Sequence, residues 1–134
     1  MEITAMNIGE WIGKRALLHP DRLFVKEGDR EWDNGFFDGQ VNRTANALAG
    51  LGVTKGCCLV TLMSNSPTFL EVFFACAKLG GIVVPVNAAL SLTELTHIVT
   101  DCAPRVLVYT PENRDKVDHL RTAVGDEVHY LAAD

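Results

Sequence analysis

Residues 50–108 decide the fold of this chain, and they read GLGVTKGCCLVTLMSNSPTFLEVFFACAKLGGIVVPVNAALSLTELTHIVTDCAPRVLV. Strands are expected at residues 59–63, 82–86 and 106–109, and one more at residues 128–131. These runs are apolar throughout and start about one strand–helix–strand unit apart, which is typical of parallel strands covered on both faces. We therefore predict an α/β fold with a doubly wound, mainly parallel sheet flanked by helices.

Capping signals predict the helices between these strands. Ser66-Pro67 has the form of a helix start, and Gly80-Gly81 has the form of a helix end. Ser91 and Glu94 are spaced as a capping box, and Thr110-Pro111 is expected to open another helix. Each expected helix thus lies between two expected strands, as a parallel sheet requires.

Upstream of this stretch, a first helix is expected to run to about Leu18. Asn7 and Glu10 are spaced as a capping box, and Met6 and Trp11 stand where a hydrophobic staple would join them. A short strand at residues 23–25 should follow this helix.

A second helix is expected across residues 37–48, because apolar residues recur there every three or four positions. Gly52 follows it as a left-handed stop. Val53 is then placed to fold back on Leu48, as a Schellman motif requires.

Composition restricts the class of protein. The chain has 134 residues, which suits a single domain over residues 1–134 with a substantial core. A net charge of −5 without a basic cluster argues against nucleic acid or an anionic membrane as the main partner. The apolar stretches fall short of the roughly 20 residues that a transmembrane segment needs. Neither a secretory signal nor a paired-cysteine framework is recognisable, so we expect a reduced, cytoplasmic protein without a metal site.

Ligands of open parallel sheets usually bind beyond the carboxyl ends of the strands. Asn65 and Asn87 stand at such ends, although both residues also suit loop bracing, which we favour. Gly80-Gly81 closes a helix where a phosphate loop would open one. The sequence contains neither GxGxxG nor GxxxxGK[ST], so we reject nucleotide binding through either motif.

Two polar groupings on expected helices are better interpreted as solvated faces than as sites. His97, Asp101 and Cys102 could be compared with a cysteine nucleophile and its base. Consecutive residues on a helix point about 100° apart, however, so Cys102 would not face His97 well. Arg114 and Lys116 could meet a phosphate, yet acidic residues are interleaved with them.

The assembled pattern resembles the adenylate-forming family, which includes acyl-CoA synthetases, aryl-CoA ligases, luciferases and peptide-synthetase adenylation domains. The matching marks cover nearly the whole chain from Ile8 onward, in the family's order: residues 42–48, 51–53, 55–56, 65–67 with Phe69, 78–81, 85–87, 94–95, Asp101 and 106–108. One departure concerns the acidic residue that usually follows the glycine at position 56. Here Cys57 and Cys58 follow it.

The resemblance implies an AMP-forming reaction in which ATP and a carboxylate give an acyl-adenylate, from which CoA displaces AMP to form a thioester. It implies ATP, Mg²⁺ and CoA as cofactors of a larger parent enzyme, with the remaining domains and a carboxylic acid as partners; a homo-oligomer is compatible with it. The family's phosphate loop and catalytic residues lie downstream of the matched region, so no catalytic residue is assigned, and the fragment alone is expected to be inactive. By position, Asn87, Ala88, Ala89 and Arg114 would approach CoA.

The resemblance favours a fatty or other hydrophobic acid as the substrate. An aryl-CoA ligase or an amino-acid adenylation domain remains an alternative within the family, because the residues that choose the acid lie mainly outside the matched region. A free-standing flavodoxin-like binding module is the alternative from another class.

Overall fold

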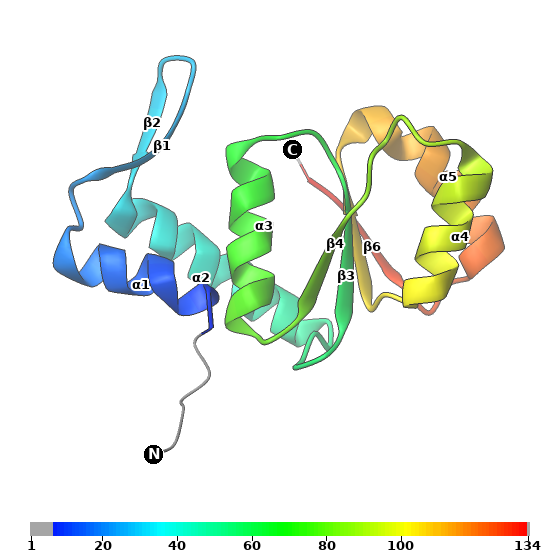
Figure 1. The fold of residues 1–134 in the computed structure, drawn as a ribbon, viewed down its shortest axis with the longest axis horizontal. Helices are drawn as coiled ribbons and strands as arrows, with labels where there is room; N and C mark the ends of the chain where they lie inside the picture. The colour runs from blue at the N-terminus through cyan, green and yellow to red at the C-terminus, as the bar shows by residue number, and fades with distance from the viewer. Residues whose placement is uncertain (1–6, 134) are drawn as a thin grey trace.

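The computed structural model describes residues 7–133 and alternates helices with strands (Figure 1). The helices are α1 (Gly9–Leu18), α2 (Asn34–Gly50), α3 (Pro67–Lys78), α4 (Leu92–Cys102), the short 3-10 helix η1 (Pro111–Asn113) and α5 (Arg114–Val124). The strands are β1 (Leu23–Glu27), β2 (Arg30–Asp33), β3 (Cys58–Leu62), β4 (Ile82–Pro85), β5 (Val106–Tyr109) and β6 (His129–Ala132).

Four strands form one parallel sheet in the order β4-β3-β5-β6. Val60 of β3 lies opposite Val84 on one side and Leu107 on the other, and Leu107 in turn pairs with Tyr130. The predicted parallel sheet is therefore confirmed, with each strand within one residue of its expected bounds.

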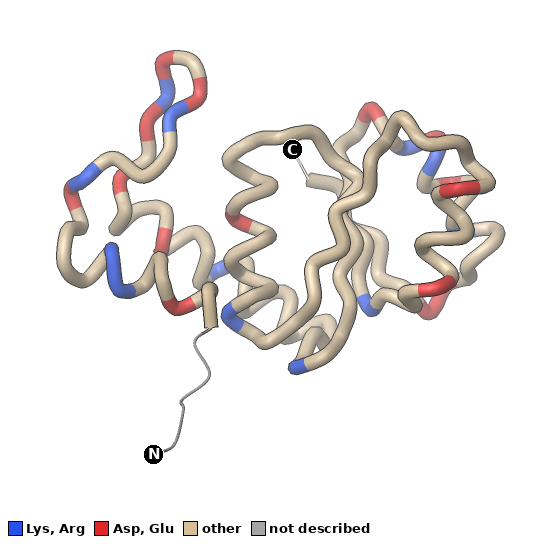
Figure 2. Tube along the Cα trace, viewed as in Figure 1, with Lys and Arg blue, Asp and Glu red and all other residues tan. Residues whose placement is uncertain are grey.

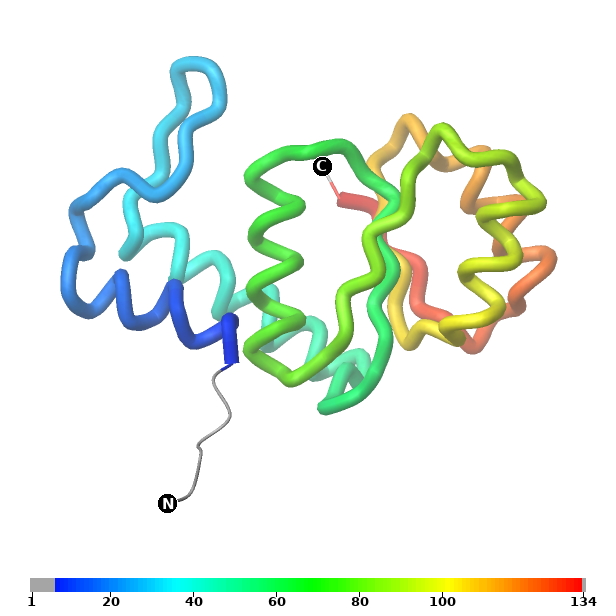
Figure 3. The backbone as a smooth tube through the Cα atoms, viewed as in Figure 1, coloured from blue at the N-terminus to red at the C-terminus, as the bar shows by residue number. Residues whose placement is uncertain are grey.

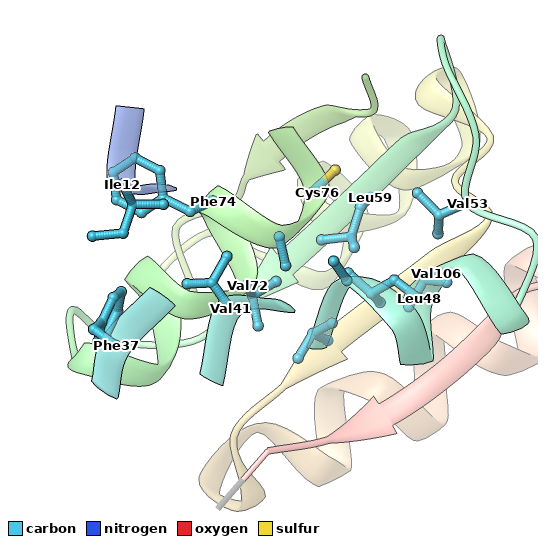
Figure 4. Packing of buried hydrophobic residues seen from close by; sticks show 13 residues of the cluster. Ile12, Phe37, Val41, Leu48, Val53, Leu59, Val72, Phe74, Cys76 and Val106 are labelled. Carbon is cyan, nitrogen blue, oxygen red and sulfur yellow. The ribbon is translucent and has the colours of Figure 1, made fainter. Parts of the chain in front are cut away.

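Helices cover both faces of this sheet, which confirms the doubly wound arrangement (Figure 1). Side chains on one face, such as Leu59 and Val106, belong to a core cluster with α1, α2 and α3 (Figure 4). Side chains of opposite parity, such as Val60 and Leu107, belong to a second cluster with α4 and α5. Burial on both faces explains why these strands are apolar throughout.

An antiparallel hairpin of β1 and β2 projects beside α1 and α2 (Figure 3). Only part of β1 was expected, and β2 was missed. Gly28 and Asp29 connect the paired residues Glu27 and Arg30, and such a two-residue connection is itself a hairpin signal. Phe24 anchors the hairpin to the core, because its ring stacks on that of Phe37 with centroids 4.6 Å apart.

The first helix begins differently from the prediction. Its N-cap is Ile8, which makes no side-chain cap, so the capping box of Asn7 and Glu10 does not form. The side chain of Asn7 instead accepts a bond from the N–H of Gly9 (2.7 Å) and donates to the carbonyl of Ala77 on α3 (2.7 Å). Tertiary contact with α3 therefore replaces the local cap, and the staple expected at Met6 falls outside the described residues.

The predicted helix ends are confirmed. After α2, Gly52 has φ of +90°, and the N–H of Val53 donates to the carbonyl of Leu48 (3.1 Å), as in a Schellman motif. After α3, the N–H of Gly81 donates in the same way to Cys76 (3.0 Å). Gly80-Gly81 thus closes a helix, as expected.

The predicted starts of α3 and α4 are also confirmed. Ser66 accepts a bond from the N–H of Phe69 (3.1 Å), and Ser91 and Glu94 form both bonds of a capping box. The element expected at Thr110-Pro111 begins as the 3-10 turn η1 and becomes α-helical only at Arg114.

Charged residues of both signs are interspersed over the described chain (Figure 2). Among residues 7–133, no helix combines the length and apolar character needed to span a bilayer. Several large apolar side chains are nevertheless exposed around the end of α1 and the start of α2, chiefly Leu17 (83%), Leu18 (69%) and Phe36 (55%).

Candidate functional site

The most informative edge of the sheet lies at the carboxyl ends of β3 and β5. These two strands are neighbours, yet the chain leaves β3 toward α3 on one face and leaves β5 toward α5 on the other. This divergence is the topological switch point at which open α/β sheets usually bind ligands.

A cleft of about 600 Å³, which we call the edge cleft, opens at this point. Its walls come from the strand ends and from the loops that follow β3, β4 and β5. It is lined by Thr61, Met63, Ser64, Asn65, Phe69, Pro85, Val86, Asn87, Ala88, Glu112 and Asn113. Asn65, Asn87 and Ala88 therefore come together as expected, whereas Ala89 and Arg114 are not part of the lining.

The loop after β4 is held by two interactions. The side-chain oxygen of Asn87 accepts a bond from the N–H of Ala89 (2.9 Å), and Lys116 of α5 donates through Nζ to the carbonyl of Ala88. Asn87 thus braces its own loop, as we favoured. Lys116 was interpreted as part of a solvated face, which is wrong: its ammonium group ties α5 to this loop.

The charges around the edge cleft are mixed. Arg114 is exposed at the start of α5. Glu112 accepts a bond from the hydroxyl of Thr110 (2.6 Å), and this bond lowers the pKa of the Glu112 carboxyl. The Glu112 carboxylate lines the edge cleft, and the Arg114 cation follows it two positions later in the sequence.

Asn113 was missed by sequence reasoning, although it organises the edge. Its side chain is 5% exposed and donates to the carbonyl of Leu62 at the end of β3 (3.0 Å). The N–H of Thr110 donates to the same carbonyl (3.3 Å). Asn113 therefore joins η1 to β3. In the sequence it could be noted only as a turn-forming residue three positions after Thr110.

A second cleft of about 500 Å³, the hairpin cleft, lies between the β1–β2 hairpin and the start of α3. Glu27, Arg30 and Trp32 line it from the hairpin, and Ser66 and Glu71 line it from the side of α3. The guanidinium of Arg30 lies 4.7 Å from the centroid of the Trp32 ring. The hairpin positions were not candidates, because β2 itself was not expected.

His97 and Asp101 are exposed on α4 and form no ion pair within residues 7–133. Cys102 directs its thiol to the carbonyl of Val99 within the same helix (3.6 Å). The polar stripe on α4 is therefore a solvated face, as predicted.

The described residues do not fit ATP or Mg²⁺. No group of three or more histidine, cysteine or acidic residues in the described range could hold a metal ion. The connections from β3 to α3 and from β4 to α4 contain no glycine, so they are not the glycine-rich loops that cradle phosphates. Arg114, in contrast, is exposed and suits a phosphate of CoA, because cations and hydrogen-bond donors are enough to bind a phosphate.

Comparison with known proteins decides the family, because the sequence model of the family of AMP-binding enzymes matches residues 13–133. This chain belongs to the AMP-binding enzyme family. An indoleacetate–CoA ligase of Aromatoleum aromaticum is 35% identical over 121 residues, which are 90% of this chain and 24% of that protein. A long-chain-fatty-acid–CoA ligase, FadD13 of Mycobacterium tuberculosis, is 30% identical over 96% of this chain and 26% of that protein.

Solved structures of this family agree with the observed fold. A fatty acyl CoA synthetase of Mycobacterium tuberculosis superimposes with a TM-score of 0.89 at 30% identity, over 96% of this chain and 26% of that one. The N-terminal domain of FACL13 from the same organism gives a TM-score of 0.90 over 97% of this chain and 34% of that one. The chain spans about a quarter of the length of these two curated relatives.

Proposed function

We propose that residues 1–134 are the N-terminal subdomain of an ATP-dependent, AMP-forming acyl-CoA ligase. Such an enzyme joins a carboxylic acid to CoA through an acyl-adenylate. The observation that carries this proposal is the doubly wound sheet with its edge cleft, in a chain whose relatives at 30–35% identity include CoA ligases. Those relatives align over 90% and 96% of this chain.

For the substrate, we propose a fatty or other hydrophobic carboxylic acid. FadD13, whose name gives a long-chain fatty acid, supports this choice at 30% identity. An aryl acid is the second candidate, since the relatives named for indoleacetate and feruloyl-CoA are 35% and 34% identical. Both acid classes join an apolar body to one carboxylate.

Asn87, Ala88, Ala89 and Arg114 are proposed as the edge that approaches CoA. Lys116 holds the loop of Ala88 through its carbonyl, and Asn87 bonds to the N–H of Ala89, so the loop is ordered before any ligand arrives. Arg114 would meet a phosphate of CoA, and the CoA thiol supplies the group that accepts the acyl chain. No step is assigned to residues that would hold ATP or Mg²⁺, because the described residues do not fit either one.

A reducing, cytoplasmic compartment is part of this proposal. All four cysteines are free thiols, and the net charge of −5 disfavours an anionic surface as partner.

Titration of the isotope-labelled chain with CoA, followed by NMR, tests the proposed edge. We expect the amide signals of Asn87, Ala89 and Arg114 to move, and Arg114→Gln to weaken binding about tenfold through the loss of a charge-assisted bond. Arg43→Gln is the matched control, since Arg43 is exposed on α2 and bonds only to Gln40 within the described residues. Unchanged affinity in Arg114→Gln would remove Arg114 from the site.

A further inference from the structure

The opposite edge of the sheet carries a cluster of thiols that the proposed function does not use. A cleft of about 460 Å³, here called the thiol cleft, lies where β3 and β5 begin. Cys57 and Cys58 line it from the start of β3, Cys102 lines it from the end of α4, and Arg105 and Glu127 provide its charges. Three of the chain's four cysteines thus share one opening.

Cys57 stands in the best-defined environment of these thiols. It closes a turn in which its N–H donates to the carbonyl of Thr54 (3.0 Å), and the Thr54 hydroxyl lies 3.3 Å from the Cys57 sulfur. The turn is fixed to the connection between α3 and β4 by a bond from the N–H of Gly56 to the carbonyl of Gly80 (3.0 Å). The Cys57 side chain is half-buried, so reagents in the cleft can reach it.

The surroundings of Cys57 favour its thiolate. The hydrogen bonds from Thr54 lower the pKa of the Cys57 thiol, burial opposes them in part, and the Arg105 guanidinium adds a weaker lowering. A thiol that is both accessible and more readily ionised is the usual site of thiol exchange.

Two of the other thiols are less suited to reaction. Cys76 is fully buried, and burial raises its pKa to about 11. Burial also raises the pKa of Cys102, whose sulfur bonds back to its own helix. Cys58 lies at the first position of β3, where its carbonyl accepts from the N–H of Arg105 (2.9 Å). The thiols in the cleft do not form a metal site with the other described residues.

We propose that Cys57 is a thiol-modification site that takes a low-molecular-weight disulfide bearing carboxylates. The Cys57 thiolate attacks one sulfur of the reagent, the reagent's sulfur–sulfur bond breaks, and a mixed disulfide forms on Cys57. The other half of the reagent leaves as a reduced thiolate and takes up the proton that Cys57 released. Arg105 attracts the carboxylates of the incoming disulfide.

The site lies on the turn through Gly56 and Cys57 that leads into β3. It also lies at the amino ends of the strands, away from the edge cleft at their carboxyl ends. The proposal therefore does not depend on the proposed ligase function.

Incubation of the 134-residue chain with glutathione disulfide, followed by mass spectrometry of the intact chain and its peptides, tests the proposal. We expect a single glutathione adduct on Cys57, formed about fivefold or more faster than on any other cysteine of the folded chain. Cys57→Ser should abolish this adduct and Cys102→Ser should retain it. A predominant adduct on Cys58 or Cys102, or an internal disulfide in its place, would overturn the proposal.

Two further comparisons test whether the surroundings of Cys57, and not its exposure alone, explain its reactivity. The wild-type chain in urea gives the reactivity of an unfolded Cys57, and an equal rate in the folded chain would contradict a role for Thr54 and Arg105. Arg105→Gln should slow the reaction with glutathione disulfide more than the reaction with neutral 4,4′-dithiodipyridine, because only glutathione disulfide also loses the attraction of its carboxylates. Equal slowing with both reagents would contradict the selection of carboxylates.

Discussion

Single polar side chains fix where the helices around the edge cleft begin. Ser66 caps α3 by accepting a bond from the N–H of Phe69, and Ser91 caps α4 by accepting one from Glu94. Each cap satisfies an N–H group that would otherwise lack a partner within its helix. These residues therefore set the direction in which the chain leaves the carboxyl ends of β3 and β4.

Replacement of Ser66 by alanine tests the cap of α3. We expect Ser66→Ala to lower the free energy of unfolding by about 1 kcal/mol, because the bond to Phe69 is lost. Ser64→Ala is the matched control, since Ser64 is exposed in the preceding loop and caps no helix. Urea unfolding measures both variants, and equal losses would show that the cap contributes nothing specific.

The capping box of α4 predicts a pH dependence. Bonds from the N–H and the hydroxyl of Ser91 lower the pKa of the Glu94 carboxyl below its ordinary value of 4.5. The resulting stabilisation is present above pH 4.5 and is lost as the pH falls through the lowered pKa. In Ser91→Ala the hydroxyl bond is lost and the stronger bond from the backbone N–H remains, so NMR titration should show the pKa of Glu94 moving only part of the way toward 4.5. The pKa of Glu112 should stay low because Thr110 still holds it. An unchanged Glu94 pKa in this variant would contradict the assigned cause.

At the scale of whole elements, α1 is placed by close contact with α3 rather than by its own sequence. A Cβ atom at Gly9 would lie 2.3 Å from the backbone nitrogen of Lys78. Lys78 in turn joins α3 to α2, since its ammonium group donates to Asp38 (2.7 Å) and Asn42 (2.6 Å). The three helices on this face of the sheet thus meet around the end of α3.

Gly9→Ala should separate α1 from α3. We expect a loss of about 1–3 kcal/mol in the free energy of unfolding, as is typical of overpacking. Gly13→Ala, on the same helix, is the control: its Cβ would have no neighbour closer than 3.8 Å, so the variant should be neutral or more stable. Thermal unfolding measures the stability of both variants. Equal changes in the two would contradict the close contact at Gly9.

Elements whose signals are local could be predicted from the sequence. The strands of the parallel sheet, the cap at Ser66 and the stop at Gly52 depend on neighbours in the chain, and the structure confirms them. The hairpin strand β2 was missed although the two-residue connection at Gly28 and Asp29 is a local hairpin signal. The start of α1 was predicted wrongly, because the side chain of Asn7 is held by Ala77, which is far away in the sequence. The bond from Lys116 to Ala88 spans 28 positions and left no pattern that periodicity could detect.

At the scale of the whole molecule, the apolar side chains at the α1–α2 end remain uncovered. A bond from the N–H of Gly35 to the carbonyl of Pro20 (2.9 Å) brings the end of α1 close to the start of α2. Leu17, Leu18 and Phe36 are exposed on these two elements. Grouped apolar side chains of this kind usually mark a surface that another domain or chain covers.

We expect the isolated chain to self-associate or to bind a hydrophobic dye through this end. The double variant Leu17→Lys, Leu18→Lys should reduce both effects, with the free energy of unfolding changed by no more than about 0.5 kcal/mol. Ile82→Lys, an exposed apolar position on β4, is the control and should leave both effects unchanged. Sedimentation velocity showing an inert wild-type monomer would favour a free-standing binding module instead.

The central claim, that this chain is part of an AMP-forming acyl-CoA ligase, is tested most directly by acid-dependent ATP–pyrophosphate exchange. The measurement uses the protein encoded by the complete native reading frame, with a panel of fatty and aryl acids, and the 134-residue chain in parallel. We predict exchange with at least one of these acids, thioester formation only when CoA is added, and neither activity in the 134-residue chain. A folded full-length protein that shows no exchange with any of these acids would contradict the account.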